Sequence, residues 1–141
     1  MVKIESRAFT LIELILVVTV IIILSAVGII SYNKSKAKAI QKEAIANVRL
    51  IGAAERIRNM EYGSYVACSC TNATTCAATT GTLGCNYALK LNLNTTNWTY
   101  GVSVAGTPEV ATITATGVAL SGCSFTLNSG NFDANPTPSG C

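Results

Sequence analysis

The sequence predicts an α+β protein in which a long N-terminal α-helix packs through its second half against a three- or four-stranded antiparallel β-sheet. Three observations predict this fold. A run of 17 residues from Leu14 to Ile30 has no charged side chain. A helical periodicity of apolar residues continues from there to Met60. Segments rich in β-branched and aromatic residues follow residue 97. We expect a short polar leader (1–8), a membrane-spanning helix (9–31), its amphipathic continuation (32–62) and a head (63–141).

The apolar segment has the length of a transmembrane helix. With its first residues included it runs from Phe9 to Ile30, 22 residues interrupted once, by Glu13. About 20 apolar residues in a helix span the hydrocarbon core of a bilayer. An ionisable group in such a segment costs about 2.5–3.5 kcal/mol at the helix centre on insertion scales, so Glu13 is by default a functional hypothesis. Lys3 and Arg7 before the segment predict a cytoplasmic N-terminus.

The helix is expected to continue beyond the membrane, to about Met60. Between Tyr32 and Met60 there is no proline and one glycine, Gly52. Apolar residues recur there at spacings of three and four, which places them on one helical face. The predicted face consists of Ala37, Ile40, Ala44, Val48, Ile51, Ala54 and Ile57.

The distal part has the pattern of a small sheet with long connections. Residues 63–97 are expected to be a loop. Apolar and polar residues alternate over 98–104, the segment 110–116 is rich in β-branched residues, and 124–127 is a third, shorter candidate strand. Residues 128–141 contain glycine, asparagine and two prolines and are expected to be a loop. An antiparallel meander packed on the helix is the simplest fold for these elements.

Six cysteines, all after residue 67, predict disulfides formed in an oxidising compartment. Zinc binding has weak support because the sequence contains no histidine and no paired C-x-x-C knuckles. Six cysteines allow 15 connectivities. We expect Cys123–Cys141, because that bond would order the C-terminal loop against the third strand. The other four are expected to pair among themselves, with a preference for Cys68–Cys85 and Cys70–Cys76.

The composition argues against catalysis and against nucleic-acid binding. No Ser/His/Asp set, metal-ligating cluster or phosphate-binding loop is present, so we expect no catalytic residues, no metal and no cofactor. After Tyr62 the only charged side chains are Lys90, Glu109 and Asp133. The distal half therefore has no basic face that would attract a phosphate backbone.

Three Asn-x-Thr triplets fit the acceptor sequence for N-linked glycosylation. Such triplets also arise by chance in a region rich in threonine and asparagine. They begin at Asn72, Asn94 and Asn97.

The motif Phe9-Thr10-Leu11-Ile12-Glu13, followed by a long apolar run, a continuing helix and a cysteine-containing sheet, resembles the type IV pilin and pseudopilin family. The resemblance is specific over residues 8–31, and only the architecture matches beyond Tyr62. It implies that a prepilin peptidase cuts between Ala8 and Phe9 and N-methylates Phe9. Glu13 would then pair with the Phe9 amine during assembly. The family usually has glycine before the cut, where this chain has Ala8.

The resemblance also implies a function. The chain would be a pilin, most like a type IVa-type major subunit, whose first helical half forms the core of an extracellular filament. It would assemble as a homopolymer from a pool in the cytoplasmic membrane, with the help of the pilus assembly machinery. Adhesion, twitching motility and DNA uptake are the family's usual outputs. The alternatives are a pseudopilin of a type II secretion system and a minor pilin with an adhesive or binding head.

Overall fold

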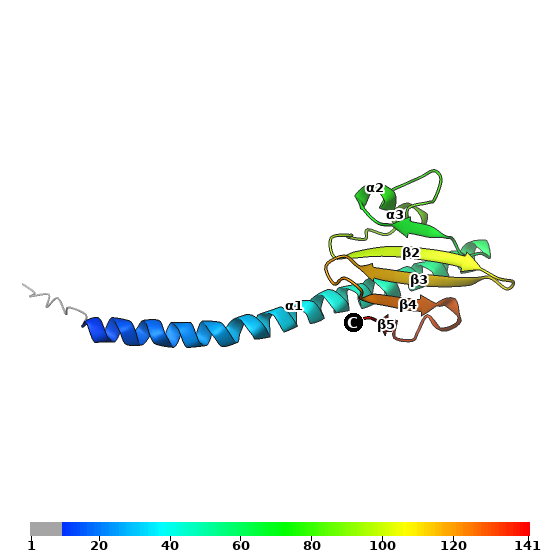
Figure 1. The fold of residues 1–141 in the computed structure, drawn as a ribbon. Helices are drawn as coiled ribbons and strands as arrows, with labels where there is room; N and C mark the ends of the chain where they lie inside the picture. Colours follow the sequence, from blue (N-terminus) through cyan, green and yellow to red (C-terminus); the bar gives the residue numbers. More distant parts are fainter. Residues whose placement is uncertain (1–9) are drawn as a thin grey trace, which may run out of the picture. The chain divides into compact units, whose positions relative to one another are not determined.

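A computed structural model describes residues 10–141, and its contacts divide the chain into two units after Lys38. One helix, α1 (Leu11–Tyr62, 52 residues), begins in the first unit and ends in the second. The second unit adds a five-stranded sheet (Figure 1). Its strands are β1 (Cys68–Cys70), β2 (Trp98–Ala105), β3 (Val110–Gly117), β4 (Ser124–Asn128) and β5 (Thr137–Ser139). Three short helices complete it: α2 (Ala73–Cys76), α3 (Cys85–Ala88) and the 3-10 helix η1 (Ser129–Asn131).

The predicted α+β class and the long helix are confirmed. The helix was expected to run from about Phe9 to Met60; α1 ends two residues later, and Phe9 lies outside the described residues. The three predicted strands are present, each one residue longer at its C-terminal end than predicted.

The sheet has five strands rather than three or four. All neighbours are antiparallel, and the spatial order is the chain order, β1 to β5. The two additional strands are three residues each and lie at the edges of the sheet, in segments predicted to be loops. Both are extended mainly by pairing with a longer neighbour, β1 with β2 and β5 with β4. Such short edge strands carry too few residues for a period-two pattern to be visible in the sequence.

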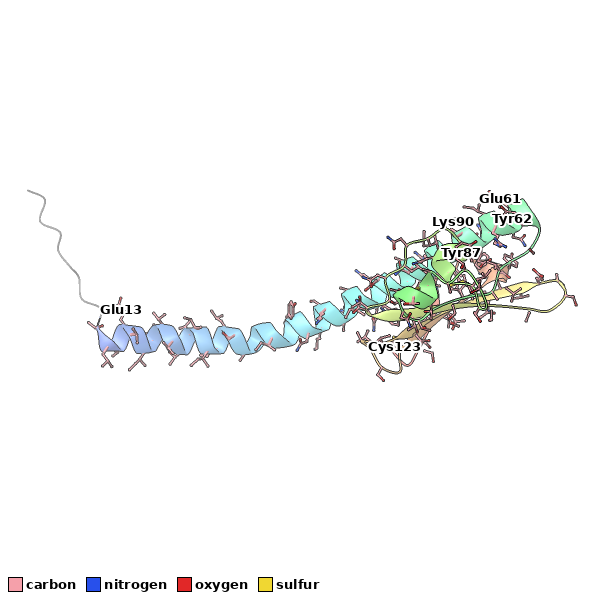
Figure 2. All side chains as sticks on the ribbon, turned by 90° about the horizontal axis from the view of Figure 1, so that it is seen from above. Glu13, Glu61, Tyr62, Tyr87, Lys90 and Cys123 are labelled. Carbon is pink, nitrogen blue, oxygen red and sulfur yellow. A yellow bond between two sulfur atoms is a disulfide. The ribbon has the colours of Figure 1, made fainter. Side chains whose placement is uncertain are left out.

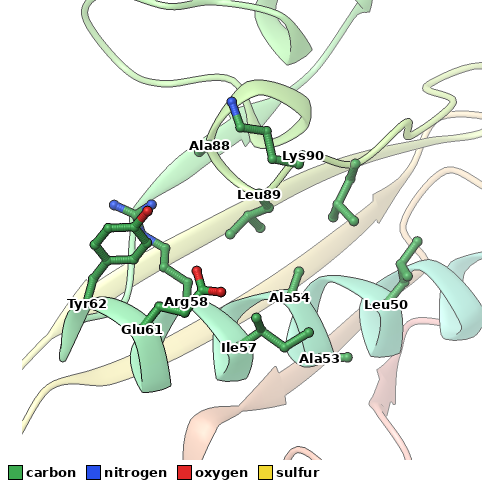
Figure 3. A pocket seen from close by; sticks show the side chains of 11 residues that line it. Leu50, Ala53, Ala54, Ile57, Arg58, Glu61, Tyr62, Ala88, Leu89 and Lys90 are labelled. Atoms are coloured by element: carbon green, nitrogen blue, oxygen red, sulfur yellow. The ribbon is translucent and has the colours of Figure 1, made fainter.

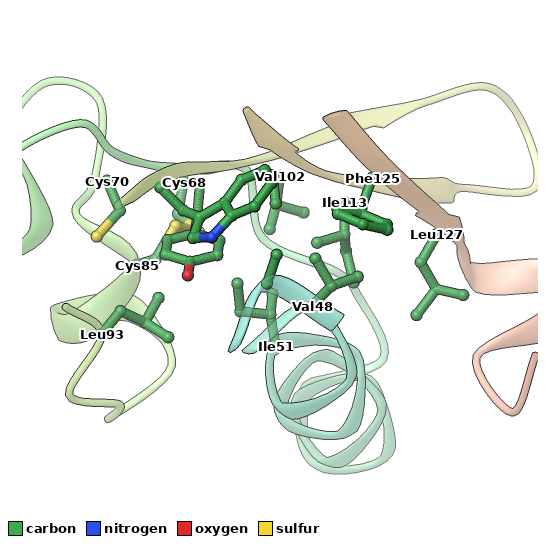
Figure 4. Close-up of a cluster of buried hydrophobic side chains, with 14 of the residues drawn as sticks. Val48, Ile51, Cys68, Cys70, Cys85, Leu93, Val102, Ile113, Phe125 and Leu127 are labelled. Carbon is green, nitrogen blue, oxygen red and sulfur yellow. A yellow bond between two sulfur atoms is a disulfide. The ribbon is translucent and has the colours of Figure 1, made fainter. Parts of the chain in front are cut away.

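The core of the second unit lies between the sheet and the C-terminal half of α1 (Figure 4). Val48 and Ile51 on the helix are fully buried, as are Trp98 on β2 and Ile113 on β3. The close approach depends on Gly52, because a Cβ there would lie 3.1 Å from Cδ1 of Phe132, 3.4 Å from Cδ2 of Leu127 on β4 and 3.5 Å from Cδ1 of Ile113 on β3. The helix backbone therefore packs directly against the side chains of the sheet.

The predicted helix face is correct in its centre and wrong at its end. Ala44, Val48 and Ile51 are buried, but Ile57 is 58% exposed. Its place on the buried face is taken by Glu55, which is fully buried. The helix turns about 100° per residue, so residue 55 lies about 40° from residue 51 around the axis, whereas residue 57 lies about 120° away.

All six cysteines are paired as Cys68–Cys85, Cys70–Cys76 and Cys123–Cys141, the pairing that the sequence favoured. The first two bonds join β1 to the start of α3 and to the end of α2. They hold together a segment that has little apolar core of its own. The third bond ties the last residue to the residue before β4.

Candidate functional site

The N-terminal part of α1 is apolar and uncovered. Thirteen leucine, isoleucine and valine side chains between Leu11 and Ile29 are exposed, by 46% to 77%. Side chains project on every side of this part of the helix (Figure 2). The helix is long and apolar enough to cross a membrane. A helix that is apolar around its whole circumference is usually buried, either in a protein or in lipid.

Glu13 lies in the first turn of α1, and its side chain is exposed. The backbone N–H groups of Glu13 and Leu14 donate to the carbonyl oxygen of Thr10, at 3.1 and 3.3 Å. A carboxylate at this end of a helix is favoured by the positive end of the helix dipole. The predicted cleavage site, Ala8–Phe9, and the Phe9 amine lie outside the described residues. The structure thus describes the position of Glu13 and does not test the predicted charge pair.

Polar side chains join α1 to β2 within the second unit. The indole Nε1 of Trp98 donates to the carbonyl oxygen of Ile40 at 2.8 Å. The Asn47 amide donates to the Tyr100 hydroxyl oxygen at 2.7 Å. The pKa of Tyr100 is raised, mainly by burial. The hydrogen bond from Asn47 opposes this shift, and the negative charge of Glu43 adds to it. The two bonds lead from different turns of α1 to different residues of β2, so together they hold the helix at one rotation about its own axis.

Within the second unit, residues 39–141, Glu55 is the one charged residue that is buried. Its Oε2 accepts the backbone N–H of Val66 at 3.1 Å, which ties the helix to the segment entering β1. Its Oε1 is buried without a hydrogen-bond partner, and so is Nε of Arg58 one turn further on. The pKa of Glu55 is raised, because burial outweighs the Val66 hydrogen bond and the Arg58 charge, which both lower it. Sequence reasoning missed this residue. The available signal was its position four residues after Ile51, on the apolar face.

A groove of about 400 Å³ lies between the C-terminal end of α1 and the segment after α3 (Figure 3). Its walls are mainly apolar. Two cations lie over aromatic rings here: Arg58 is 5.1 Å from the ring centre of Tyr62, and Lys90 is 4.7 Å from that of Tyr87. The lining residues are Leu50, Ala53, Ala54, Ile57, Arg58, Glu61, Tyr62, Ala88, Leu89, Lys90 and Leu91.

The region predicted to be a disulfide-bonded loop is more regular than expected. α2 begins with a reciprocal cap: Oδ1 of Asn72 accepts the backbone N–H of Thr75, and Oγ1 of Thr75 accepts that of Asn72, both at 2.9 Å. This pattern satisfies two donors that a helix start leaves free. The cap and the Cys70–Cys76 bond fix the same short segment from two sides.

Comparison of the chain with models of protein families, with curated proteins and with solved structures found no match.

Proposed function

We propose that this chain is a subunit of the type IV pilin class, which polymerises through the N-terminal part of α1 into an extracellular filament. One observation carries the proposal. The chain joins a helix segment that is apolar on all sides, with a single carboxylate near its start, to a separately folded, disulfide-bonded head.

The exposed apolar segment supports assembly. Burying a leucine, isoleucine or valine side chain contributes about 1.5–3 kcal/mol relative to leaving it exposed. Covering thirteen partly exposed side chains would therefore stabilise a complex by an amount on the order of 10 kcal/mol or more. In the cell, lipid would cover them before assembly and neighbouring copies of the chain would do so afterwards.

Glu13 supplies a reason for ordered rather than random association. A buried carboxylate without a partner is strongly unfavourable, whereas one paired with a cation is tolerated. Cleavage before Phe9 would create an amine that remains cationic after methylation. A neighbouring copy could then neutralise Glu13 only at the register where the two groups meet.

The head supports a location outside the cytoplasm. Its six cysteines are all oxidised, and disulfides of this density are typical of secreted and surface domains. The pool of unassembled chains would lie in the cytoplasmic membrane with the N-terminus inside, and the assembled filament on the cell surface. Prepilin peptidase and the assembly machinery would be its partners.

The test is fibre production by cells that carry variants of Glu13. Glu13→Gln keeps the shape of the side chain and removes its charge, and Glu13→Asp keeps the charge. We expect both proteins in the membrane fraction at the level of the unmodified chain. Shed fibres, counted by electron microscopy and identified by peptide mass spectrometry, should be lost in Glu13→Gln and retained at least in part in Glu13→Asp.

The outcomes separate the proposal from its alternatives. Abundant long fibres made of this chain support a major subunit. Its presence as a trace component of fibres made of another protein favours the minor pilin with a binding head, and its presence only in a short periplasmic fibre favours the pseudopilin. Normal fibre yield from Glu13→Gln contradicts charge pairing, and a chain that stays soluble without detergent contradicts the proposal as a whole.

A further inference from the structure

We propose that Asn94 is an N-linked glycosylation site, and that it is the one acceptor among the chain's three Asn-x-Thr triplets that the folded head presents to a transferase. The proposal rests on the proposed function in one respect, that the head lies outside the cytoplasm. It otherwise depends on local geometry, because the three triplets lie in three different backbone structures.

Asn94 lies in a tight turn in the segment between α3 and β2. Its Oδ1 accepts the backbone N–H of Thr96 at 2.9 Å and the Thr96 hydroxyl at 2.6 Å. Both partners are donors, so the atom that faces them is the amide oxygen. The amide nitrogen Nδ2 therefore faces away from the turn, and both side chains are exposed. The reactive nitrogen and the hydroxyl of the acceptor triplet are thus presented together.

The turn is held at both ends. Leu93 before it is buried, and its backbone N–H donates to Oδ1 of Asn86 at 2.8 Å. Trp98 after it is fully buried in the core. The exposed turn is therefore a fixed projection of the head, which costs little ordering when an enzyme binds it.

Asn72 is exposed, but its side chain is already engaged in capping a helix. It is the N-cap of α2, and its Oδ1 accepts the backbone N–H of Thr75. The triplet hydroxyl belongs to Thr74, which is inside the helix, and side chains two residues apart on a helix do not face the same side. An enzyme would have to unwind α2 against the Cys70–Cys76 bond to bring Asn72 and Thr74 together.

Asn97 is blocked more directly. Its Nδ2 donates to Oε2 of Glu43 at 2.8 Å, and the side chain is only partly exposed. Its triplet hydroxyl, on Thr99, lies in β2, whose backbone pairs with β3 at this position. Modifying Asn97 would break the bond to α1 and displace the start of a paired strand.

The reaction is a transfer of a glycosyl group from a lipid-diphosphate-linked oligosaccharide to Asn94. A bond forms between Nδ2 and the anomeric carbon, and the bond from that carbon to the diphosphate oxygen breaks. The diphosphate leaves with the bonding electrons, and Nδ2 loses one proton to a base of the transferase. A sugar at Asn94 would cover uncharged surface of the head, which has few ionic groups of its own to hold water.

The test uses the full chain in a host that carries an oligosaccharyltransferase and its lipid-linked glycan. A reference Asn-Ala-Thr triplet is appended after Cys141, and only material in which this triplet is modified is scored. Peptide mass spectrometry with electron-transfer fragmentation then gives the occupancy of each site. We expect a glycan on Asn94 and at least tenfold lower occupancy at Asn72 and Asn97.

Variants of the same turn provide the controls. Asn94→Gln and Thr96→Val should abolish the modification, and Thr96→Ser, which keeps the hydroxyl, should retain it. Asn72→Gln should leave it unchanged. An unmodified Asn94 beside a modified reference triplet overturns the proposal, and so does equal occupancy of all three sites. An unmodified reference triplet shows instead that the head did not reach the transferase, which counts against the proposed location.

Discussion

Replacing Glu55 by glutamine should leave the head as stable as before, or more stable, at neutral pH. The carboxylate is fully buried, and one of its oxygens has no hydrogen-bond partner. Glutamine keeps an oxygen that can accept the Val66 N–H and removes the charge. Alanine removes the acceptor as well and leaves a cavity in the core.

The magnitudes follow from these contacts. A buried polar atom without a partner costs about 1–3 kcal/mol, and more if it is charged. Glu55→Gln exchanges an unpaired charged atom for an unpaired neutral one, so we expect a gain of about 1 kcal/mol near pH 7. Glu55→Ala loses the bond to Val66 and the packing of the side chain, and should cost about 2–4 kcal/mol.

The pH dependence has a definite sign. Burial raises the pKa of Glu55 in the folded head. The folded state then binds the proton more tightly than the unfolded chain does. The stability contributed by this group is therefore fully present below the ordinary glutamate pKa of about 4.3 and is lost as the pH rises through the raised folded-state value. Glutamine does not bind this proton, so the free energy of unfolding of Glu55→Gln should lack this part of the pH dependence. Its stability relative to the unmodified chain should therefore fall as the pH is lowered.

Urea unfolding of the full chain in detergent micelles measures these differences. Trp98 is the only tryptophan and is fully buried, so its fluorescence reports the head. Glu61→Gln, at an exposed glutamate of the same helix, is the matched control and should leave the unfolding midpoint at pH 7 unchanged. The reasoning is refuted if Glu55→Gln at pH 7 is destabilised as much as Glu55→Ala. The carboxylate would then make a net favourable interaction in its ionised form.

Two further predictions use the same unfolding measurement. Replacing Cys123 and Cys141 together by serine should destabilise the head by about 3 kcal/mol, because the bond closes a loop of 18-residue separation; an unchanged midpoint would contradict this. Gly84→Ala should be more damaging than Gly81→Ala. A Cβ at Gly84 would lie 2.1 Å from a backbone carbonyl oxygen, whereas Gly81 has a φ of +73° but open space around it. Overpacking should cost about 3 kcal/mol at Gly84, and strain about 1 kcal/mol at Gly81; equal effects would contradict the packing seen here.

The long elements were predictable because their patterns repeat. The apolar run and its continuation provide many turns of consistent helical spacing, and β2 and β3 are eight residues each with visible alternation or β-branched content. The disulfide pairing was foreseeable in part. Cys123–Cys141 was expected because it orders the C-terminal loop, whereas the pairing among the other four cysteines was only a preference that the structure confirms.

The short elements were not predictable. β1 and β5 are three residues each, and α2 and α3 are four. Their structure comes from tertiary pairing and from the disulfides, not from local preference. In α2, Asn72 and Thr75 are a plausible capping pair, but a single-turn helix is marginal on its own, and here the Cys70–Cys76 bond also holds it.

Glu13 and Glu55 belong to one helix, yet neutralising each should affect a different measurement. Neutralising Glu55 should change the unfolding of the head, and neutralising Glu13 should change fibre formation. Glu55 is buried within the head, so its cost is expressed by the isolated chain. Glu13 is exposed, so its neutralisation should leave the unfolding of the head unchanged. If it nevertheless abolishes fibres, the effect arises only when another copy covers it. Measuring both variants by both assays therefore separates a carboxylate that acts on folding from one that acts on assembly. A loss of head stability in Glu13→Gln would remove that separation, and with it the argument that Glu13 selects the register between copies.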